Sequence, residues 1–311
     1  MIGVPADFPP PANADIPSAT VVITTKNRKA DLAGAIKSVL AQRGNVECLV
    51  VDDASTDGTA DMVRSEFPSV RLEVSPESRG YIVQRNLGAQ LARGKVIFSI
   101  DDDAIFSTPD VVQQTLEDFD HPAIGAVAIP FINVNQDDVL RQRALDTAQR
   151  WIAPHYIGTA HAIRRDVFLQ CGQYRGELIH QGEERDLSIR MINAGYFVRL
   201  GRADPIHHFE SPKRNFERMA RFGRRNDVLF AWQNVPLPWT PIYTMATTLN
   251  GLRFLVGSPD WRAHMAGLTA GYRSILGKGF PRRPVSGRAL RTYRMLVRKR
   301  QVRLESLVSG G

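Results

Sequence analysis

Apolar stretches of strand length alternate with amphipathic segments through the first part of the chain. The strand-length stretches are rich in β-branched residues and cover 19–24, 46–51, 70–74 and 96–100. Between them, apolar residues recur at helical spacing over 30–40, 59–67 and 83–92. Strands that alternate with helices at this spacing predict an α/β domain, with a mostly parallel sheet and helices on both of its faces.

The second half of the chain continues with strands and then with helices. An apolar run over 123–133 predicts a further strand, and 139–151 has the spacing of a helix. Residues 156–163 predict a strand in which Gly158 permits another group to approach closely. Helices are expected from 182 to 192 and from 216 to 232.

Residues 228–252 carry no charge and are numerous enough to span a bilayer. Several prolines and amides interrupt this stretch: Pro236, Pro238, Pro241, Gln233, Asn234 and Asn250. These interruptions favour a hairpin that is packed in the core or lies in a membrane interface.

The last helical pattern, over 288–304, is basic and amphipathic. Its apolar positions are Leu290, Tyr293, Leu296, Val297 and Leu304, and many arginines lie between them. Such a helix suits an anionic membrane surface, although a solvated basic tail or a face for a partner protein is the alternative. We therefore predict three parts: a proline-rich arm (1–17), the α/β domain (18–215) and a basic, mainly helical extension (216–311).

Charge is distributed unevenly along the 311 residues. The net charge is +8, but residues 261–311 contain twelve Lys or Arg against the single acid Glu305, so the first 260 residues carry −3. A basic surface is thus confined to the C-terminal part, which argues against a nucleic-acid groove in the main domain. Cys48 and Cys171 form neither a disulfide framework nor a metal-ligand spacing, which favours a reducing compartment.

The N-terminal residues show neither the basic start nor the apolar core of a signal peptide. With the cysteine usage, this leads us to expect a cytoplasmic protein, free or peripheral on the inner face of the plasma membrane.

Polar clusters follow three of the predicted strands: 24–28, Asp52-Asp53 and Asp101-Asp102-Asp103. Ligands of parallel sheets bind at the carboxyl ends of strands, so we expect these clusters to share one site. Three adjacent carboxylates repel one another unless a cation is shared, and oxygen ligands suit Mg²⁺ or Mn²⁺. The alternative for the triplet is a solvated acidic turn or a helix cap.

Two further clusters carry candidate chemistry. Glu183, Glu184 and Asp186 open a predicted helix, where acids stabilise the helix dipole, but one of them is also available as a metal-free general base. His207 and His208 follow, and an imidazole beside carboxylates suits Mn²⁺.

The order of the motifs TTKNR, VVDDASTDGT, SRGYIVQRNLGAQLARG and SIDDD resembles the inverting family 2 glycosyltransferases of the GT-A fold over 18–211. The resemblance implies a nucleotide-diphosphate sugar as donor, a divalent metal on a D-x-D element and direct displacement at the anomeric carbon. We expect a saccharide or lipid-linked acceptor, and the charge of the basic C-terminal part is what favours a lipid-linked or cell-envelope one.

By position, the resemblance implies a role for each matching residue. Donor-nucleotide contacts fall on Thr24, Thr25, Asn27, Arg28, Asp53, Arg85, Asn86, Asp101 and Asp102. Asp101 and Asp103 form the D-x-D pair, Asp103 is the expected direct metal ligand, and one of His207 and His208 joins them. Glu184 occupies the position of the usual Asp base, with Glu183 as the other candidate, and Asp186 binds the acceptor or orients its helix. Gly88 and Gly94 are expected to be packing or cap glycines.

Two other classes of function remain as alternatives. A nucleotidyltransferase would use the same metal chemistry but would need a glycine-rich loop after the first strand, and TTKNRK has none. A non-enzymatic basic module would bind through its tail and would leave both acid clusters without a purpose. The sequence leaves open the sugar, the base, the acceptor and the oligomeric state.

Overall fold

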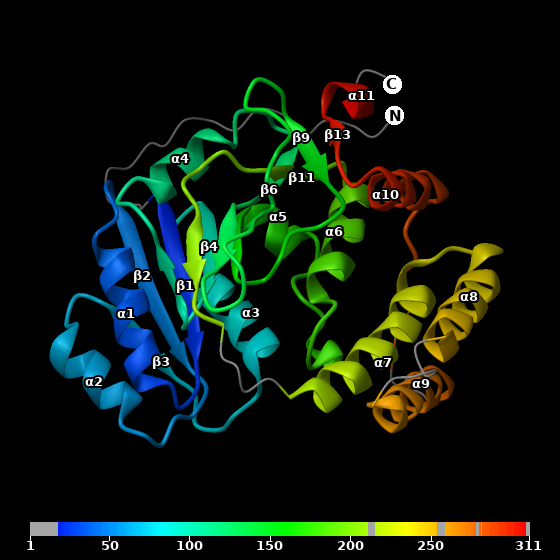
Figure 1. Ribbon diagram of the computed structural model, residues 1–311, viewed down its shortest axis with the longest axis horizontal. Coiled ribbons are helices and arrows are strands. Elements are labelled where there is room, and N and C mark those ends of the chain that lie inside the picture. Colours follow the sequence, from blue (N-terminus) through cyan, green and yellow to red (C-terminus); the bar gives the residue numbers. More distant parts are fainter. Residues whose placement is uncertain (1–17, 211–214, 254–258, 278–279, 281, 309–311) are drawn as a thin grey trace.

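The computed structural model describes residues 18–210, 215–253, 259–277, 280 and 282–308. The predicted arm, 1–17, lies outside these residues. A nine-stranded sheet forms the centre of the molecule (Figure 1). In sheet order its strands are β13 (Val302–Arg303), β9 (Trp151–Ala153), β11 (Phe197–Leu200), β6 (Ile124–Ala128), β10 (Ala160–Arg164), β4 (Val96–Asp101), β1 (Ala19–Thr25), β2 (Val46–Asp52) and β3 (Arg71–Val74).

The sheet is mostly parallel, as predicted. Strands β1 to β4 run in one direction, and β6 and β11 pair parallel with each other. The two reversals are β10, which lies antiparallel between β4 and β6, and β9, which lies antiparallel between β11 and β13. A second, four-stranded sheet has the order β5 (Ala104–Phe106), β12 (Ile206–His208), β7 (Phe131–Asn133) and β8 (Leu140–Arg141).

Helices cover both faces of the large sheet because its strands are apolar on both sides. Val21 and Ile23 of β1 pack in one core with α1 (Lys29–Leu40), α2 (Thr59–Glu66) and α4 (Val111–Glu117). Val22 packs in a second core with α3 (Tyr81–Leu91), α5 (Arg165–Gln170), α6 (Glu183–Asn193) and the 3₁₀ turn η1 (Gly176–Leu178). This alternation of neighbouring residues between two cores confirms the predicted α/β architecture.

The C-terminal part is helical, as predicted, and consists of α7 (Phe216–Asn234), α8 (Trp239–Arg253), α9 (Trp261–Leu276), α10 (Gly287–Lys299) and the short α11 (Glu305–Val308). Helices α7, α8 and α9 lie together beside the sheet, on its α6 side (Figure 1). The chain then returns, and β13 adds an edge strand to the large sheet. The end of the predicted extension is thus built into the α/β domain.

The uncharged stretch 228–252 forms a hairpin whose two halves have different surroundings. Its first part, at the end of α7, is buried at Val228 and Leu229, whereas Ile242, Met245 and Leu249 of α8 are exposed. Within the described ranges, none of the helices has both the length and the hydropathy that crossing a bilayer requires.

The apolar face of α10 is covered by protein. Leu290, Tyr293 and Leu296 are buried in a third core with Ile152 of β9 and Ile189 of α6. These three residues of the face are therefore covered by protein, whereas Val297, the fourth apolar position predicted within this helix, is 50% exposed beside the basic residues of α10.

Three local predictions were wrong. Residues 139–151 form no helix: they contain β8 and then a turn in which Asp146 accepts hydrogen bonds from the backbone of Ala148 and Gln149. The run 123–133 is two strands in different sheets, β6 and β7, with Pro130 between them. The strand predicted over 156–163 begins only at Ala160.

We expect opposite effects from alanine at two glycines. A Cβ on Gly94 would lie 2.5 Å from backbone atoms of Ala19 and Thr20 in β1, whereas one on Gly34 of α1 meets nothing within 4 Å. Gly94→Ala should lower the free energy of unfolding by about 1–3 kcal/mol because a central strand must move. Gly34→Ala should raise it by about 0.5–1 kcal/mol through helix propensity. Urea unfolding measures both, and a neutral Gly94→Ala would contradict the close packing.

Candidate functional site

The polar clusters meet at the carboxyl ends of neighbouring strands, as the sequence predicts. In the sheet register Thr24 lies beside Asp101, and Thr25 lies beside Asp52. The site therefore sits where β1, β2 and β4 end, and the second sheet joins it through β12 because Asp103 precedes β5, which pairs with β12.

Two arginines pair with the three aspartates: Arg85 with Asp101, and Arg28 with both Asp102 and Asp103. Asp101 Oδ1 lies 2.6 Å from Arg85 Nη2, and Asp103 Oδ2 lies 2.8 Å from Nη2 of Arg28. Asp102 faces β1 instead, with Arg28 Nε at 3.3 Å from its Oδ1 and the Thr25 hydroxyl donating to its Oδ2 at 2.8 Å. Asp102 thus orients the β1 loop, and two arginines supply the counter-charge that the triplet requires.

Burial acts on the pKa values of two of these carboxyls with different outcomes. It raises the pKa of Asp102 to about 7, and Arg28 and Thr25 only partly offset it. For Asp103 burial also favours the neutral form, but His208 and Arg28 together outweigh it and hold the pKa below its usual range.

Asp101, Asp103 and His208 can share a cation. They each offer one ligand atom, and these atoms all lie within 4.8 Å of one another. His208 Nε2 is 3.3 Å from Asp103 Oδ1, while its Nδ1 is 2.8 Å from the amide oxygen of Asn133. The Asn133 oxygen can accept a hydrogen bond from Nδ1–H, so a metal would take the place of the proton on Nε2, the nitrogen that faces Asp103. The donor set therefore fits Mn²⁺ or Mg²⁺.

The structure separates the two histidines. His207 and His208 are consecutive in β12, so their side chains point to opposite faces of the small sheet. His208 is the one grouped with the aspartates, so of the two candidate ligands the structure favours His208.

Arg85 joins the two acid clusters, which are far apart in the sequence. This guanidinium from α3 is 7% exposed, binds Asp101, and lies 3.4 Å from Glu183 Oε1 at the start of α6. It also donates to the carbonyl of Gly158 at 3.3 Å. A Cβ on Gly158 would lie 2.8 Å from both Arg85 Nη1 and Glu184 Oε1, so this glycine permits the predicted close approach.

The two candidate bases have different environments. Glu183 is 1% exposed and turned toward Arg85, whereas Glu184 is partly exposed and lines a pocket of about 270 Å³. Burial raises the pKa of both carboxyls, which lie close enough to titrate together. The pocket is completed by His155 after β9, by residues at and just before the start of α6, and by residues of α7: Gln181, Gly182, Arg185, Gly223, Arg224, Asn226 and Asp227.

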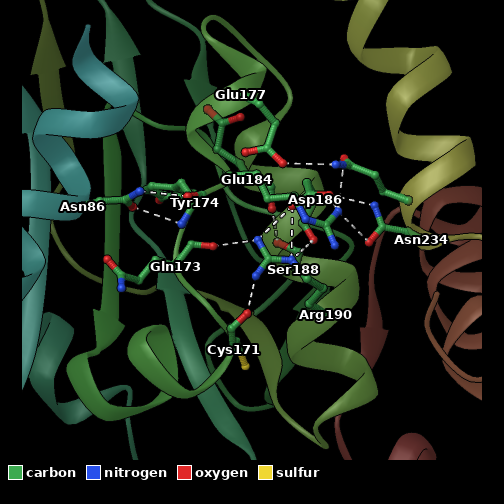
Figure 2. A network of polar contacts seen from close by, with 12 residues as sticks. Asn86, Cys171, Gln173, Tyr174, Glu177, Glu184, Asp186, Ser188, Arg190 and Asn234 are labelled. Atoms are coloured by element: carbon green, nitrogen blue, oxygen red, sulfur yellow. Dashed lines mark hydrogen bonds and ion pairs between the residues drawn. The ribbon is translucent and has the colours of Figure 1, made fainter. Parts of the chain in front are cut away.

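Asp186 holds α6 in place and is 1% exposed. It accepts from Arg175 at 2.6 Å, from Arg190 at 2.8 Å and from Asn234 of α7 at 2.7 Å (Figure 2). Every side of the carboxylate is therefore occupied by protein. These contacts are those expected of a residue that orients the helix; the alternative role, contact with the acceptor, stays a prediction and would require some of these bonds to be exchanged.

Asp53 is also occupied by protein donors. It accepts hydrogen bonds from the Ser78 hydroxyl, the backbone N–H groups of Arg79 and Gly80, and the Gln84 amide, at 2.5–3.1 Å. Burial would raise its pKa, but these four bonds hold it below the usual range. A carboxylate accepts about four such bonds. Asp53 thus positions the segment before α3, and its predicted contact with a base would require some of these bonds to be exchanged.

Asn86 and Asn27 also bind backbone. The Asn86 amide exchanges two hydrogen bonds with the backbone of Tyr174, at 2.8 and 3.0 Å, and so ties α3 to the segment before α6 (Figure 2). The predicted contact of Asn86 with the nucleotide stays a prediction and would require these bonds to be exchanged. Asn27 has φ of +53°, a conformation that Asn tolerates, and accepts from the backbone of Thr56 at 2.7 Å. The loops after β1 and β2 are joined in this way. Thr24 stays partly exposed at the rim.

Sequence reasoning missed Asn133, Arg224 and Asp227. Asn133 ends an apolar run, as the aspartates do, and a polar residue at the carboxyl end of a strand was the available signal. Asp227 lies 2.5 Å from Arg185 and 3.1 Å from Arg224 in the wall of the pocket. Arg224 and Asp227 are three residues apart on α7, a helical spacing that was the available signal, whereas the contact of Asp227 with Arg185 depends on how α7 lies against α6.

Comparisons with known proteins define the class of this site. Residues 20–176 match the family described as "Glycosyl transferase family 2", and the chain belongs to this family. It is 38% identical over 128 residues to the succinoglycan biosynthesis protein ExoO of Rhizobium meliloti, covering 40% of this chain and 36% of that one. It is 35% identical over 126 residues to validoxylamine A glucosyltransferase of Streptomyces hygroscopicus, covering 39% and 30%. The chain thus spans about a third of the length of these relatives.

Solved structures show the same fold at low sequence identity. The mannosyltransferase PcManGT from Pyrobaculum calidifontis, in complex with GDP-Man and Mn²⁺, has a TM-score of 0.57 at 20% identity, over 92% of this chain and 81% of that one. GalNAc-T7 with UDP, GalNAc and Mn²⁺ has a TM-score of 0.53 at 16% identity, over 84% and 58%. With the family match, this likeness confirms the expected GT-A-type fold.

The two histidines provide a matched test of the metal site. His208→Ala should lower Mn²⁺ affinity roughly tenfold or more, because it removes one of three ligands. His207→Ala removes an equal side chain from the other face of the same strand and should leave the affinity unchanged. Calorimetric titration of Mn²⁺ measures both, and equal affinities for the two variants would contradict the assignment.

Proposed function

We propose that the chain is a metal-dependent, inverting glycosyltransferase that moves a sugar from a nucleotide-sugar donor to an acceptor hydroxyl in cell-envelope polysaccharide or glycolipid synthesis. The observation that carries this proposal is the bridge by Arg85 between Asp101 and Glu183. It holds a candidate metal site and a metal-free acid pair side by side, at the edge of the sheet where ligands bind.

On the donor side, Asp101, Asp103 and His208 would hold Mn²⁺ or Mg²⁺ against the diphosphate. When bound, the cation offsets the negative charge that develops on the leaving nucleoside diphosphate. Arg28 is one-third exposed beside these carboxylates, so its guanidinium is placed to bind a phosphate oxygen. The Mn²⁺ and nucleotide ligands named for PcManGT and GalNAc-T7 support this choice.

On the acceptor side, Glu184 is our choice for the general base. The acceptor oxygen forms a bond to the anomeric carbon, the bond from that carbon to the diphosphate oxygen breaks, and the hydroxyl proton passes to the Glu184 carboxylate. Burial raises the pKa of Glu184, which makes it a better proton acceptor than an exposed carboxylate. Attack from the face opposite the leaving group inverts the anomeric centre.

The pocket beside Glu184 is our proposed acceptor site. Its wall is polar, with Asn226, the Arg185–Asp227 ion pair and His155 around the carboxylate. Polar groups of this kind suit the hydroxyls of a saccharide head group.

Two isosteric variants test the base. Glu184→Gln should lower the transfer rate by roughly 10²–10⁴-fold, because an amide cannot take the proton, while Mn²⁺-dependent nucleotide binding is retained. The assay measures nucleoside diphosphate released from UDP-, GDP- and dTDP-sugars with saccharide and polyprenyl-linked acceptors.

Glu183→Gln is the matched control. It weakens the pairing with Arg85, so a smaller loss is expected. If Glu183→Gln abolishes transfer and Glu184→Gln does not, the assignment is reversed. If the wild-type chain binds nucleotide but releases none with any donor and acceptor, the transferase proposal fails.

A further inference from the structure

Helix α8 presents a continuous apolar stripe that no described part of the chain covers. Trp239, Ile242, Met245, Leu249 and Leu252 follow one another at intervals of three or four residues, so they share one face of the helix. Their exposed fractions lie between 40% and 59%. Single exposed apolar residues are common on proteins, but a stripe of five along one helix marks an interaction surface.

The stripe borders an apolar cavity of about 490 Å³ between α7, α8 and α9. Met245 and Leu249 form its edge on α8, and Tyr272 and Leu276 line it from α9. Leu276 is 84% exposed. The surface is therefore an apolar face with a hollow in it.

The charge around this face is almost entirely positive. Residues 235–304 contain thirteen Lys or Arg and the single acid Asp260. Arg253 at the end of α8, and Arg262 and Arg273 on α9, are all exposed. Helix α10, whose apolar face is buried, adds charge to this region but offers no apolar face of its own.

We propose that the α8–α9 face docks on the surface of an anionic lipid bilayer, with the α8 stripe at the boundary between head groups and acyl chains. The basic residues around the stripe complement anionic head groups. Trp239 and Trp261, which are the first residues of the two helices and half exposed, are of the type enriched at this boundary. A protein partner would more commonly meet a rim of both charge signs.

The docking face is rigidly connected to the pocket beside Glu184. Gly267 and Gly271 of α9 lie against the α7 backbone at Arg221 and Arg225, where side chains would not fit. Helix α7 in turn supplies Asp227 to the pocket wall. Docking would thus hold the pocket at a fixed distance from the bilayer. This step rests on the proposed function, and such a position suits a lipid-linked acceptor.

Vesicle sedimentation of the full chain tests the docking without any substrate, so its outcome is independent of the transfer reaction. Wild type should bind vesicles of phosphatidylcholine mixed with phosphatidylglycerol and bind pure phosphatidylcholine much more weakly. The variant Ile242→Ser/Met245→Ser/Leu249→Ser should bind the anionic vesicles roughly tenfold or more weakly. Arg253→Gln/Arg262→Gln/Arg273→Gln should reduce the binding and its dependence on salt.

The matched control is Leu40→Ser/Val139→Ser/Leu145→Ser, which removes three exposed apolar side chains outside α8 and α9 and should bind as wild type does. If the triple α8 variant fails to fold, the single variant Met245→Ser replaces it, and a blue shift of tryptophan emission that is present in wild type and lost in Trp239→Leu on addition of vesicles gives a second measurement. Wild-type binding by the α8 variant would overturn the proposal. The proposal would also be overturned if light scattering showed a dimer for wild type and a monomer for the α8 variant, and neither protein bound vesicles.

Discussion

The buried guanidinium of Arg85 is the interaction on which the site depends. It lies between Asp101 at the end of β4 and Glu183 at the start of α6, and the ring of Tyr81 lies 4.9 Å from its centre. Burial opposes the charge on Arg85, but the two carboxylates outweigh it and keep its pKa above the usual value. Without this cation, the acids of both clusters would face each other in a poorly hydrated space. A planar donor with five N–H groups can serve both carboxylates and a backbone carbonyl at once, as a lysine could not.

Around this centre, many polar residues of the site position the backbone. Asp53 fixes the segment before α3, Asp186 fixes α6 against α7, and Asn86 ties α3 to Tyr174. The remaining residues of the site are placed to meet ligands: Asp101, Asp103, His208 and Glu184. The division follows from the hydrogen-bond partners, because a carboxylate whose acceptor positions are filled by backbone and amide donors supports its neighbours, while Asp101 and Glu184 stay partly exposed.

The sequence predicted the parts of the fold that local pattern controls. Apolar runs and helical spacing located β1, β2, β4 and their helices, and the ends of these strands located Asp101 and Asp103. It could not choose between His207 and His208, because the pairing of β12 with β5 and β7 decides which side chain faces the aspartates. The helix predicted over 139–151 is absent because Asp146 accepts hydrogen bonds in a turn there, and because both ends of the segment pair with other strands. Helical periodicity likewise found an apolar face on α10 but not the protein core that covers it.

The central claim is that Asp101, Asp103 and His208 form a metal site that holds a nucleoside diphosphate. The most direct measurement is the thermal midpoint of the purified chain with UDP, GDP, dTDP and CMP, each with and without Mn²⁺, for wild type and for Asp103→Ala. Ligand linkage raises the midpoint only where the native state binds. We predict a Mn²⁺-dependent increase with one diphosphate that is lost in Asp103→Ala. No increase with any nucleotide, or an equal increase in Asp103→Ala, would contradict the account.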